Sequence, residues 1–200
     1  MTASVRGVAT RRRILESAVT RFADQGFRQT SVAQVARDAG LTPPAVHAHF
    51  GSKEALFQAA FDLDVTKMLE VIQARLARGA LTGAVDLSPH GLTLIPELVA
   101  AIEDHPLVRR VFQGLEPDRT PDLLRSPAVV AVREQMISAV RTGQALGVLR
   151  ADLDAVALGG AIETLVLSLL LAAVQIGTAD DGRRSALLAI VNRGLRAGSA

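Results

Sequence analysis

The sequence predicts an all-α protein with a three-helix amino-terminal unit, a long linking helix and a larger carboxy-terminal helical domain. Apolar residues recur at helical spacing along most of the 200-residue chain, and glycine or proline separates the segments. Hydrophobic residues make up 49% of the chain, which is enough to bury a full core. Two short capped helices near the amino terminus complete the pattern.

The first expected helix runs from about Thr10 to Gln25. Gly26 closes it, because glycine adopts the left-handed conformation that ends a helix at little steric cost. The stretch from Met1 to Ala9 is expected to be a flexible arm. Phe27 is expected to pack under the following helices. The core face of this helix consists of Ile14, Leu15, Ala18, Phe22 and Ala23.

A second helix is predicted at the start of the segment from Thr30 to Phe50. Ser31 is a good N-cap and Gln34 follows three residues later, so the two have the form of a capping box. The helix is expected to stop at Ala39-Gly40.

Thr42 is expected to cap a third helix, from Pro43 to about His49. Pro43 and Pro44 belong in its first turn, where a missing N–H is not needed. Two short helices joined by three or four residues containing glycine form a helix-turn-helix, whose second helix enters the DNA major groove.

Ser52 begins a long helix that is expected to continue to about Arg78. At 1.5 Å per residue it would be roughly 38 Å long, enough to link a head to a separate body. Asp152 or Asp154 is expected to cap a later helix. Between these, helices are expected over Leu92–Glu103 (with Pro96 as a kink or a restart), His105–Gln113 and Pro127–Gly143, with connectors at 79–90 and Glu116–Pro127.

The segment from Ala155 to Gly177 is apolar almost throughout and long enough to cross a bilayer. A small integral membrane protein spanning at 155–177 is therefore one alternative. Glu163 near its centre and the lack of interfacial aromatic residues argue against it. We favour a bundle between two subunits, completed by a helix at Asp181–Leu195, with Leu167 and Leu170 in the interface.

Charge is distributed unevenly along the chain. Up to Glu54 there are eight Lys or Arg residues against four Asp or Glu, whereas the remainder has 14 against 16. The basic excess coincides with the helix-turn-helix, which points to DNA as the partner. Arg6 either joins Arg11, Arg12 and Arg13 along the DNA or has no role.

Several functional classes receive no support. There are no cysteines, so disulfides and thiolate sites are excluded and a cytoplasmic location is natural. His47 and His49 lie two apart on a helix and point in different directions, so no metal site is expected. No catalytic motif stands out, so we expect no catalytic residues and no cofactor; a helical enzyme remains an alternative.

Residues 10–27 (TRRRILESAVTRFADQGF) and 51–57 (GSKEALF) flank the two-helix motif. Over residues 10 to about 57 the chain resembles the TetR family of transcriptional regulators. The segment GVLRADLD at 147–154 also resembles the turn before the penultimate long helix of such proteins. One position departs from the family pattern Tyr-x-His-Phe, since the chain has His47-Ala48-His49-Phe50.

The resemblance implies a DNA-binding domain at residues 1–54 and an effector-binding and dimerisation domain at 55–200. It further implies a homodimeric repressor that leaves a palindromic operator when a small hydrophobic effector binds, with no membrane partner. A DNA-binding protein without an effector remains an alternative. Met68, Phe112 and Met136 are candidates for the effector pocket, and could equally be core residues.

The candidate DNA contacts fall into two groups. Helix N-termini, hydroxyls and basic side chains bind phosphate, which selects Arg28, Thr30, Ser31, His47 and Lys53. Lys53 best follows the family pattern. Bases are expected to be read by Thr42, Pro43, Pro44 and Ala45, with Gln34 or Arg37 from the preceding helix.

Proline and alanine offer no hydrogen bonds to base edges, so DNA shape is expected to contribute to specificity. His47 either contacts a phosphate, in which case its protonation is coupled to DNA binding, or packs neutrally against its own helices.

Overall fold

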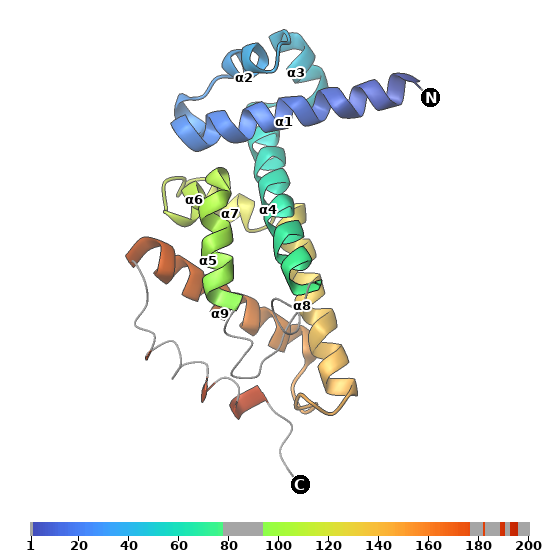
Figure 1. Cartoon of the computed structure of the whole chain (residues 1–200), viewed down its shortest axis with the longest axis vertical. Coiled ribbons are helices and arrows are strands. Elements are labelled where there is room, and N and C mark those ends of the chain that lie inside the picture. Colours follow the sequence, from blue (N-terminus) through green and yellow to red (C-terminus); the bar gives the residue numbers. More distant parts are fainter. Residues whose placement is uncertain (1, 78–93, 177–181, 183–188, 191–192, 196–200) are drawn as a thin grey trace.

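The computed structural model describes residues 2–77, 94–176, 182, 189–190 and 193–195. A head made of α1, α2 and α3 lies across one end of α4, and the remaining helices form a body along the rest of α4 (Figure 1). The helices are α1 (Thr2–Gln29), α2 (Val32–Asp38), α3 (Pro43–Phe50), α4 (Lys53–Ala77), α5 (Leu94–Asp104), α6 (Pro106–Phe112), α7 (Thr120–Leu123), α8 (Pro127–Ala145) and α9 (Ala155–Ile176).

Helix α1 begins earlier than expected. It starts at Thr2, so the expectation of a flexible arm over residues 1–9 is wrong for its described part, and the amino-terminal turns project past the head (Figure 1). Gly7 costs about 1 kcal/mol inside a helix but does not end one, so the helix extends backwards from its well-packed middle. Gly26 does interrupt α1, with φ 78° and ψ 171°.

The predicted caps of the head are confirmed. Ser31 has extended backbone angles, and its side chain and that of Gln34 form both bonds of the capping box. Gly40, with φ 64°, follows the end of α2. Thr42 is the N-cap residue of α3, but its hydroxyl makes no capping hydrogen bond. The geometry of the helix-turn-helix is therefore set largely by local sequence.

Most helices of the body lie where the sequence predicts them. Helix α5 is described from Leu94 to Asp104 and contains Pro96. Since the residues just before Leu94 lie outside the described ranges, the kink or restart expected at Pro96 stays a prediction. The expected connector at Glu116–Pro127 contains the short helix α7, a correction that follows from Pro121 at a first-turn position. The predicted connector at 79–90 lies outside the described residues, as does most of the predicted helix at Asp181–Leu195.

Helix α4 holds the amino-terminal ends of two body helices. Asp64 accepts hydrogen bonds from the amides of Leu107 and Val108 at 2.9 and 3.1 Å, and lies 2.9 Å from His105 Nδ1. Asp62, two residues earlier, accepts from the amide of Ala128 at 3.3 Å. A carboxylate satisfies free amides and opposes the positive end of the helix dipole, so α4 is tied to both α6 and α8.

A single hydrophobic cluster runs from the head into the body. Phe57 of α4 packs edge-on against Phe22 and Phe27 of α1, with ring centroids 4.9 and 5.2 Å apart. The same cluster continues to Leu107 of α6 and Leu170 of α9. Head and body are therefore packed against each other rather than joined by a free linker.

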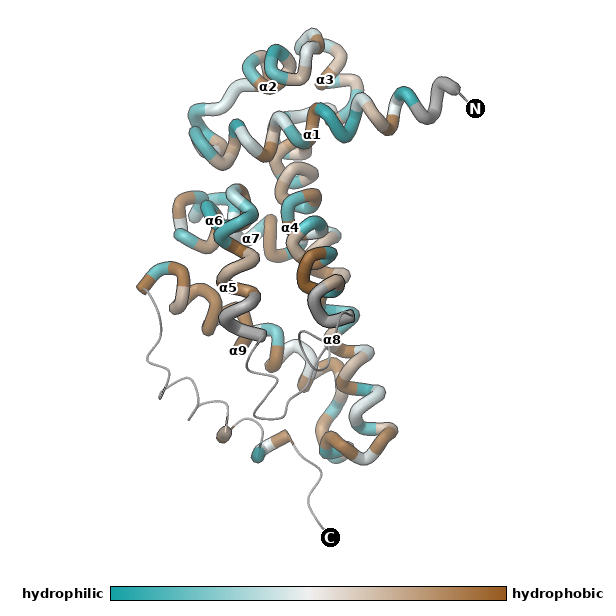
Figure 2. Tube along the Cα trace, viewed as in Figure 1, coloured by the Kyte–Doolittle hydropathy of each residue, from teal (hydrophilic) through white to brown (hydrophobic). Residues whose placement is uncertain are grey.

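Helix α9 is long and apolar enough to cross a membrane, with a mean hydropathy of 2.1 over its most apolar window (Figure 2). Within the chain it packs in the body, where Glu163 is buried and pairs with Arg133 of α8 at 2.5 and 3.0 Å. Leu170 is 5% exposed and belongs to the chain's own core, so assigning it to a subunit interface was wrong. Because the segment is apolar on all sides, its composition did not reveal which face of α9 packs in the chain's own core.

Candidate nucleic-acid interface

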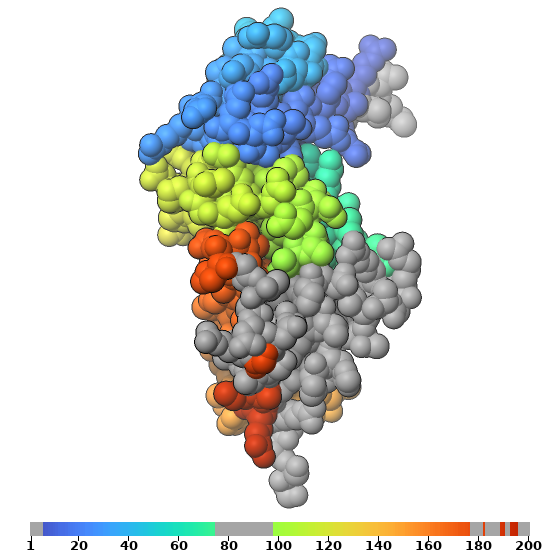
Figure 3. Space-filling model, turned by 60° about the vertical axis from the view of Figure 1, so that its left-hand side comes forward, coloured from blue at the N-terminus to red at the C-terminus, as the bar shows by residue number. Residues whose placement is uncertain are grey.

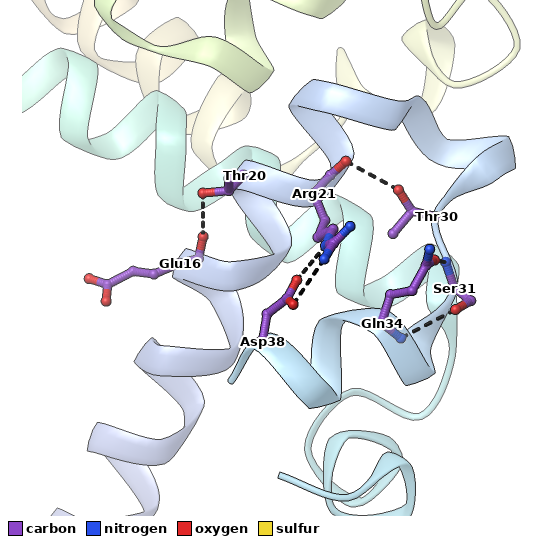
Figure 4. A network of polar contacts seen from close by, with 7 residues as sticks. All are labelled: Glu16, Thr20, Arg21, Thr30, Ser31, Gln34 and Asp38. Atoms are coloured by element: carbon purple, nitrogen blue, oxygen red, sulfur yellow. Dashed lines mark hydrogen bonds and ion pairs between the residues drawn. The ribbon is translucent and has the colours of Figure 1, made fainter. Parts of the chain in front are cut away.

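A bidentate ion pair braces α2 against α1. Arg21 donates to both carboxylate oxygens of Asp38, at the end of α2 (Figure 4). These hydrogen bonds hold the pKa of Asp38 below its ordinary value of 3.8. Because the pair joins α1 to the last turn of α2, it fixes where the turn before α3 begins.

The other end of the motif is held by Arg11. Its guanidinium donates to the carbonyl of His49 at 3.2 Å and stacks over the Phe50 ring, 4.2 Å from the centroid. A cation at the carbonyl end of a helix also opposes the helix dipole. Arg11 is thus a positioning residue for α3 that sequence reasoning assigned only to the DNA backbone.

The exposed face of α3 carries most of the predicted base-reading residues. Thr42, Pro43 and Pro44 are exposed, whereas Ala45 is half-buried. The Thr42 hydroxyl makes no cap, so it is free to bond outside the protein. Ala48 is also exposed here and was missed; its small apolar side chain gave no signal in the sequence.

His47 lies on the same exposed face, and its ring is held by the backbone. Nδ1 is 3.2 Å from the carbonyl oxygen of Gly51, a residue with φ 74°. A carbonyl only accepts, so Nδ1 carries the proton of that bond and Nε2 of the neutral ring is an acceptor. Among the described residues, Nε2 has no partner.

The candidates on α2 are placed differently from one another. The Gln34 side chain accepts from the amide of Ser31 at 2.7 Å, and the Ser31 hydroxyl accepts from the amide of Gln34 at 3.2 Å. Both are therefore partly occupied in the capping box. The Arg37 side chain is exposed and makes no hydrogen bond or ion pair with any described residue, so its guanidinium is available to DNA.

Thr30 is not on the surface. Its side chain is buried in the head, and its hydroxyl donates to the carbonyl of Arg21 at 3.2 Å (Figure 4). The expectation that it faces a phosphate is corrected: its partner lies nine residues earlier, which spacing in the sequence did not reveal.

Arg28 and Lys53 lie near the base of the head. Arg28 forms an ion pair with Asp118 of the body, so it faces the junction rather than a free phosphate-binding surface. Lys53 is half-buried, with Nζ 3.4 Å from the carbonyl of Arg28 and 4.5 Å from the centre of the Phe27 ring. Lys53 therefore caps the end of α1 as well as standing at the family position for DNA contact.

The basic triplet is divided among three roles. Arg11 holds α3, and Arg12 pairs with Glu16 at 3.0 Å, which lowers the pKa of that carboxyl. Arg13 is exposed and has no described partner. Arg6, further along the projecting end of α1, is likewise exposed without one.

The junction between head and body contains two hollows. One, of about 390 Å³, lies between the end of α1 and the segment that follows α6, and is lined by Phe27, Arg110 and Glu116 among others. The second, of about 240 Å³, lies between α4 and the α7 region. The effector candidates line neither: Met68 is buried in the core, and Phe112 and Met136 are half-buried.

No group of three or more potential metal ligands occurs within the described ranges of the chain. The chemistry of the head is that of exposed cations, hydroxyls and one imidazole around a short braced helix. Such a surface binds polyanions and inserts a helix into the DNA groove. Fold and surface together define a helix-turn-helix DNA-binding protein.

Comparison with known proteins identifies the family. Residues 14–60 match the family described as bacterial regulatory proteins, tetR family. The amino-terminal head is therefore that of the TetR family of transcriptional regulators, which confirms the resemblance seen in the sequence. The match favours neither the membrane alternative nor the enzyme alternative.

Similar proteins extend this match beyond the head. An uncharacterised HTH-type transcriptional regulator, YdgC of Bacillus subtilis (strain 168), is 24% identical over 85% of this chain and 86% of its own length. The A-factor receptor protein of Streptomyces griseus is 37% identical over 62 residues, covering 31% of this chain and 22% of the receptor. A TetR-family regulator from Pectobacterium atrosepticum, a solved structure, superposes with a TM-score of 0.64 at 24% identity over 98% of both chains.

Proposed function

We propose that the protein is a homodimeric repressor that binds a palindromic operator in the cytoplasm and releases it when a small hydrophobic effector enters the body. The observation that supports this most directly is the helix-turn-helix, in which the Arg21–Asp38 pair braces α2 and Arg11 braces the end of α3. A rigid, exposed helix of this length suits the major groove.

The proposed DNA surface combines the face of α3 with cations of the head. Thr42 and His47 can form hydrogen bonds, while Pro43, Pro44 and Ala48 can touch thymine methyl groups. Arg13, Arg37 and Lys53 supply positive charge for the phosphates. Few groups can read bases directly, so half-site spacing and DNA shape carry part of the specificity.

The proposed dimer uses the uncovered face of α9. Only 28% of its most apolar window is buried within one chain. The exposed positions Ala157, Ala161, Thr164, Ser168 and Leu171 recur at alternating spacings of four and three, as in a helix–helix seam. The two hydroxyls in this row donate to carbonyls of their own helix, so a second apolar surface can cover them without leaving a donor unpaired.

The proposed effector is hydrophobic because the body offers an aliphatic interior with few aromatic side chains. The chain has no Trp or Tyr, and Met68, Phe112 and Met136 remain the candidates for the lining. One relative is named the A-factor receptor protein, which supports control by a bound ligand. Binding in the body changes DNA affinity through α4 and α6, both of which contact the head or its supporting residues.

Selection of bound fragments from a genomic DNA pool tests the proposal. We expect a palindromic product whose binding weakens with salt, since each neutralised phosphate contributes about −0.9 to the slope of log K against log[salt]. Lys53→Ala should lower affinity for all sequences alike, because a phosphate contact carries no base information. Protein that shows no salt-dependent binding to any duplex would refute the function.

A further inference from the structure

Helix α1 is missing one of its own hydrogen bonds where the head meets the body. In a continuous helix the amide of Phe27 would donate to the carbonyl of Ala23, four residues earlier. Gly26 has backbone angles outside the helical region, so the ladder is broken between them. The freed Phe27 amide is buried and the freed Ala23 carbonyl is partly buried, so both need other partners.

The body supplies both partners from one ion pair. The Phe27 amide donates to Oε1 of Glu116 at 3.0 Å, and the Ala23 carbonyl accepts from Nη1 of Arg110 at 3.2 Å. Nε of Arg110 donates to the same Glu116 oxygen at 2.7 Å. An arginine and a glutamate of the body therefore stand in place of one main-chain hydrogen bond of the head.

The two side chains lie close against Gly26. A Cβ atom on Gly26 would lie 2.4 Å from Arg110 Nη2 and 2.6 Å from Glu116 Oε1. The Glu116 side chain is 7% exposed and that of Arg110 is 21% exposed, so water screens the pair weakly. Figure 3 shows the head resting directly on the part of the body that contains α6 and α7.

A second ion pair, Arg28–Asp118, crosses the same junction but is exposed to solvent. Arg28 and Asp118 are 84% and 58% exposed. Exposed pairs of this kind contribute little to stability because water and salt screen them. The junction thus offers an enclosed pair and an exposed pair a few residues apart, which makes the second a matched control for the first.

We propose that the Arg110–Glu116 pair is a positioning clamp that sets the angle of the head on the body, and thereby the half-site spacing that the dimer accepts. The inference rests on the proposed function, a dimer on palindromic DNA. In such a dimer the separation of the two α3 helices must match the separation of the half-sites. The clamp acts through geometry and touches no DNA.

The test uses the full chain and the operator obtained by selection, together with duplexes in which the half-site separation is one or two base pairs shorter or longer. The wild type should bind the selected spacing at least about tenfold more tightly than its neighbours, which corresponds to 1.4 kcal/mol. Arg110→Gln and Glu116→Gln should flatten this preference to within about threefold, while the preferred half-site sequence stays the same.

Two controls separate positioning from stability. Asp118→Asn, at the exposed pair, should keep the wild-type spacing preference. A duplex with a single half-site should bind all variants alike. Glu116→Gln keeps an acceptor for the Phe27 amide and is the milder change. If Arg110→Gln fails to melt cooperatively, the spacing preference is therefore measured on Glu116→Gln alone.

Wild-type spacing preference in a folded Glu116→Gln variant overturns the clamp, even if its melting temperature is lower, because the pair would then be structural only. Failure of the proposed function gives a different result, in which the wild type binds no duplex selectively. A flattened preference in Asp118→Asn as well would assign the effect to junction charge in general and also overturn the clamp.

Discussion

The His47 ring can donate a hydrogen bond to a phosphate only when it is protonated. Nδ1 is committed to the Gly51 carbonyl, so the neutral ring offers an acceptor at Nε2. Phosphate oxygens are also hydrogen-bond acceptors, so the lone pairs of Nε2 and of a phosphate oxygen would repel each other. A tyrosine, usual in the family at this place, donates from a neutral hydroxyl.

Replacing His47 with Tyr should therefore remove a pH dependence from DNA binding. If His47 contacts phosphate, the complex holds a proton that the free protein holds less often, so linkage requires tighter binding as pH falls from 8 to 6. The extra charge should steepen the salt slope by about 0.9 at pH 6. Operator titrations of wild type and His47→Tyr at both pH values measure this.

His49 could produce a similar effect, so His49→Gln serves as the control and should keep the wild-type pH dependence. The prediction is wrong if His47→Tyr and wild type respond equally to pH. The ring would then act as a neutral group, either packed or accepting from a base amino group.

Asp38 makes a second prediction possible at this scale. Arg21 lowers its pKa in the folded protein, so the pair adds stability above the ordinary value of 3.8, and that stability is lost as pH falls through the folded-state pKa. Asp38→Asn should have a lower urea midpoint than wild type at pH 7, and the gap should narrow towards pH 3. Glu134→Gln, at an exposed residue with no described ion pair, should show no such narrowing.

Among the helices, the sequence was sufficient to predict an end wherever the capping residue and its partner lie within a few residues of each other. The Ser31–Gln34 capping box, the glycine after α2 and the proline start of α3 were all predicted from the sequence. These elements depend on main-chain geometry, which the sequence specifies directly.

Site residues were predicted less well because their roles depend on distant partners. The Arg28 side chain looks like a phosphate ligand until Asp118, 90 residues later, is placed beside it. The errors at Thr30 and Leu170 have the same cause, since the Arg21 carbonyl that binds the Thr30 hydroxyl and the core that buries Leu170 are not visible in the local sequence. By contrast Thr42, Pro43 and Pro44 were selected by their place at the start of the recognition helix, and all three are exposed.

Packing between α8 and α9 gives a prediction with a neighbouring control. A Cβ atom on Gly159 would lie 2.7 Å from Ile137 Cγ1 and 3.2 Å from its Cα, whereas one on Gly160 would meet nothing within 4 Å. Gly159→Ala should destabilise the protein by about 1–3 kcal/mol through overpacking. Gly160→Ala should be neutral, or stabilising by about 0.5–1 kcal/mol, through lower backbone entropy in the unfolded chain.

Urea denaturation at one fixed protein concentration compares the two, because assembly alters apparent stability. If Gly159→Ala is as stable as Gly160→Ala, the backbone of Ile137 yields and the close contact between α8 and α9 is not rigid.

At the scale of the whole molecule, α9 presents one face to its own core and another outward. Leu170 is 5% exposed and Leu171 is 39% exposed. Leu171→Arg should give folded monomers that lose operator affinity, because a charge is placed in the proposed interface. Leu170→Arg should instead lower the melting temperature of each chain, because it buries a charge in the monomer core.

Sedimentation and thermal melting distinguish the two variants. A wild-type protein that sediments as a monomer at micromolar concentration contradicts the dimer. A Leu171→Arg variant that remains dimeric would move the interface to another face.

The double role of α4 limits how such regulators could be recombined. Phe57 and Ala60 belong to the core under the head, and one turn later Asp62 and Asp64 hold α8 and α6. A chimera that joined this head to a foreign body would have to cut within that turn, and would also part Gly26 from Arg110 and Glu116. We therefore expect such a chimera to lose contacts that hold both parts of this chain, and a change of DNA specificity to be easier to obtain by substitutions on α3 than by exchange of the whole head.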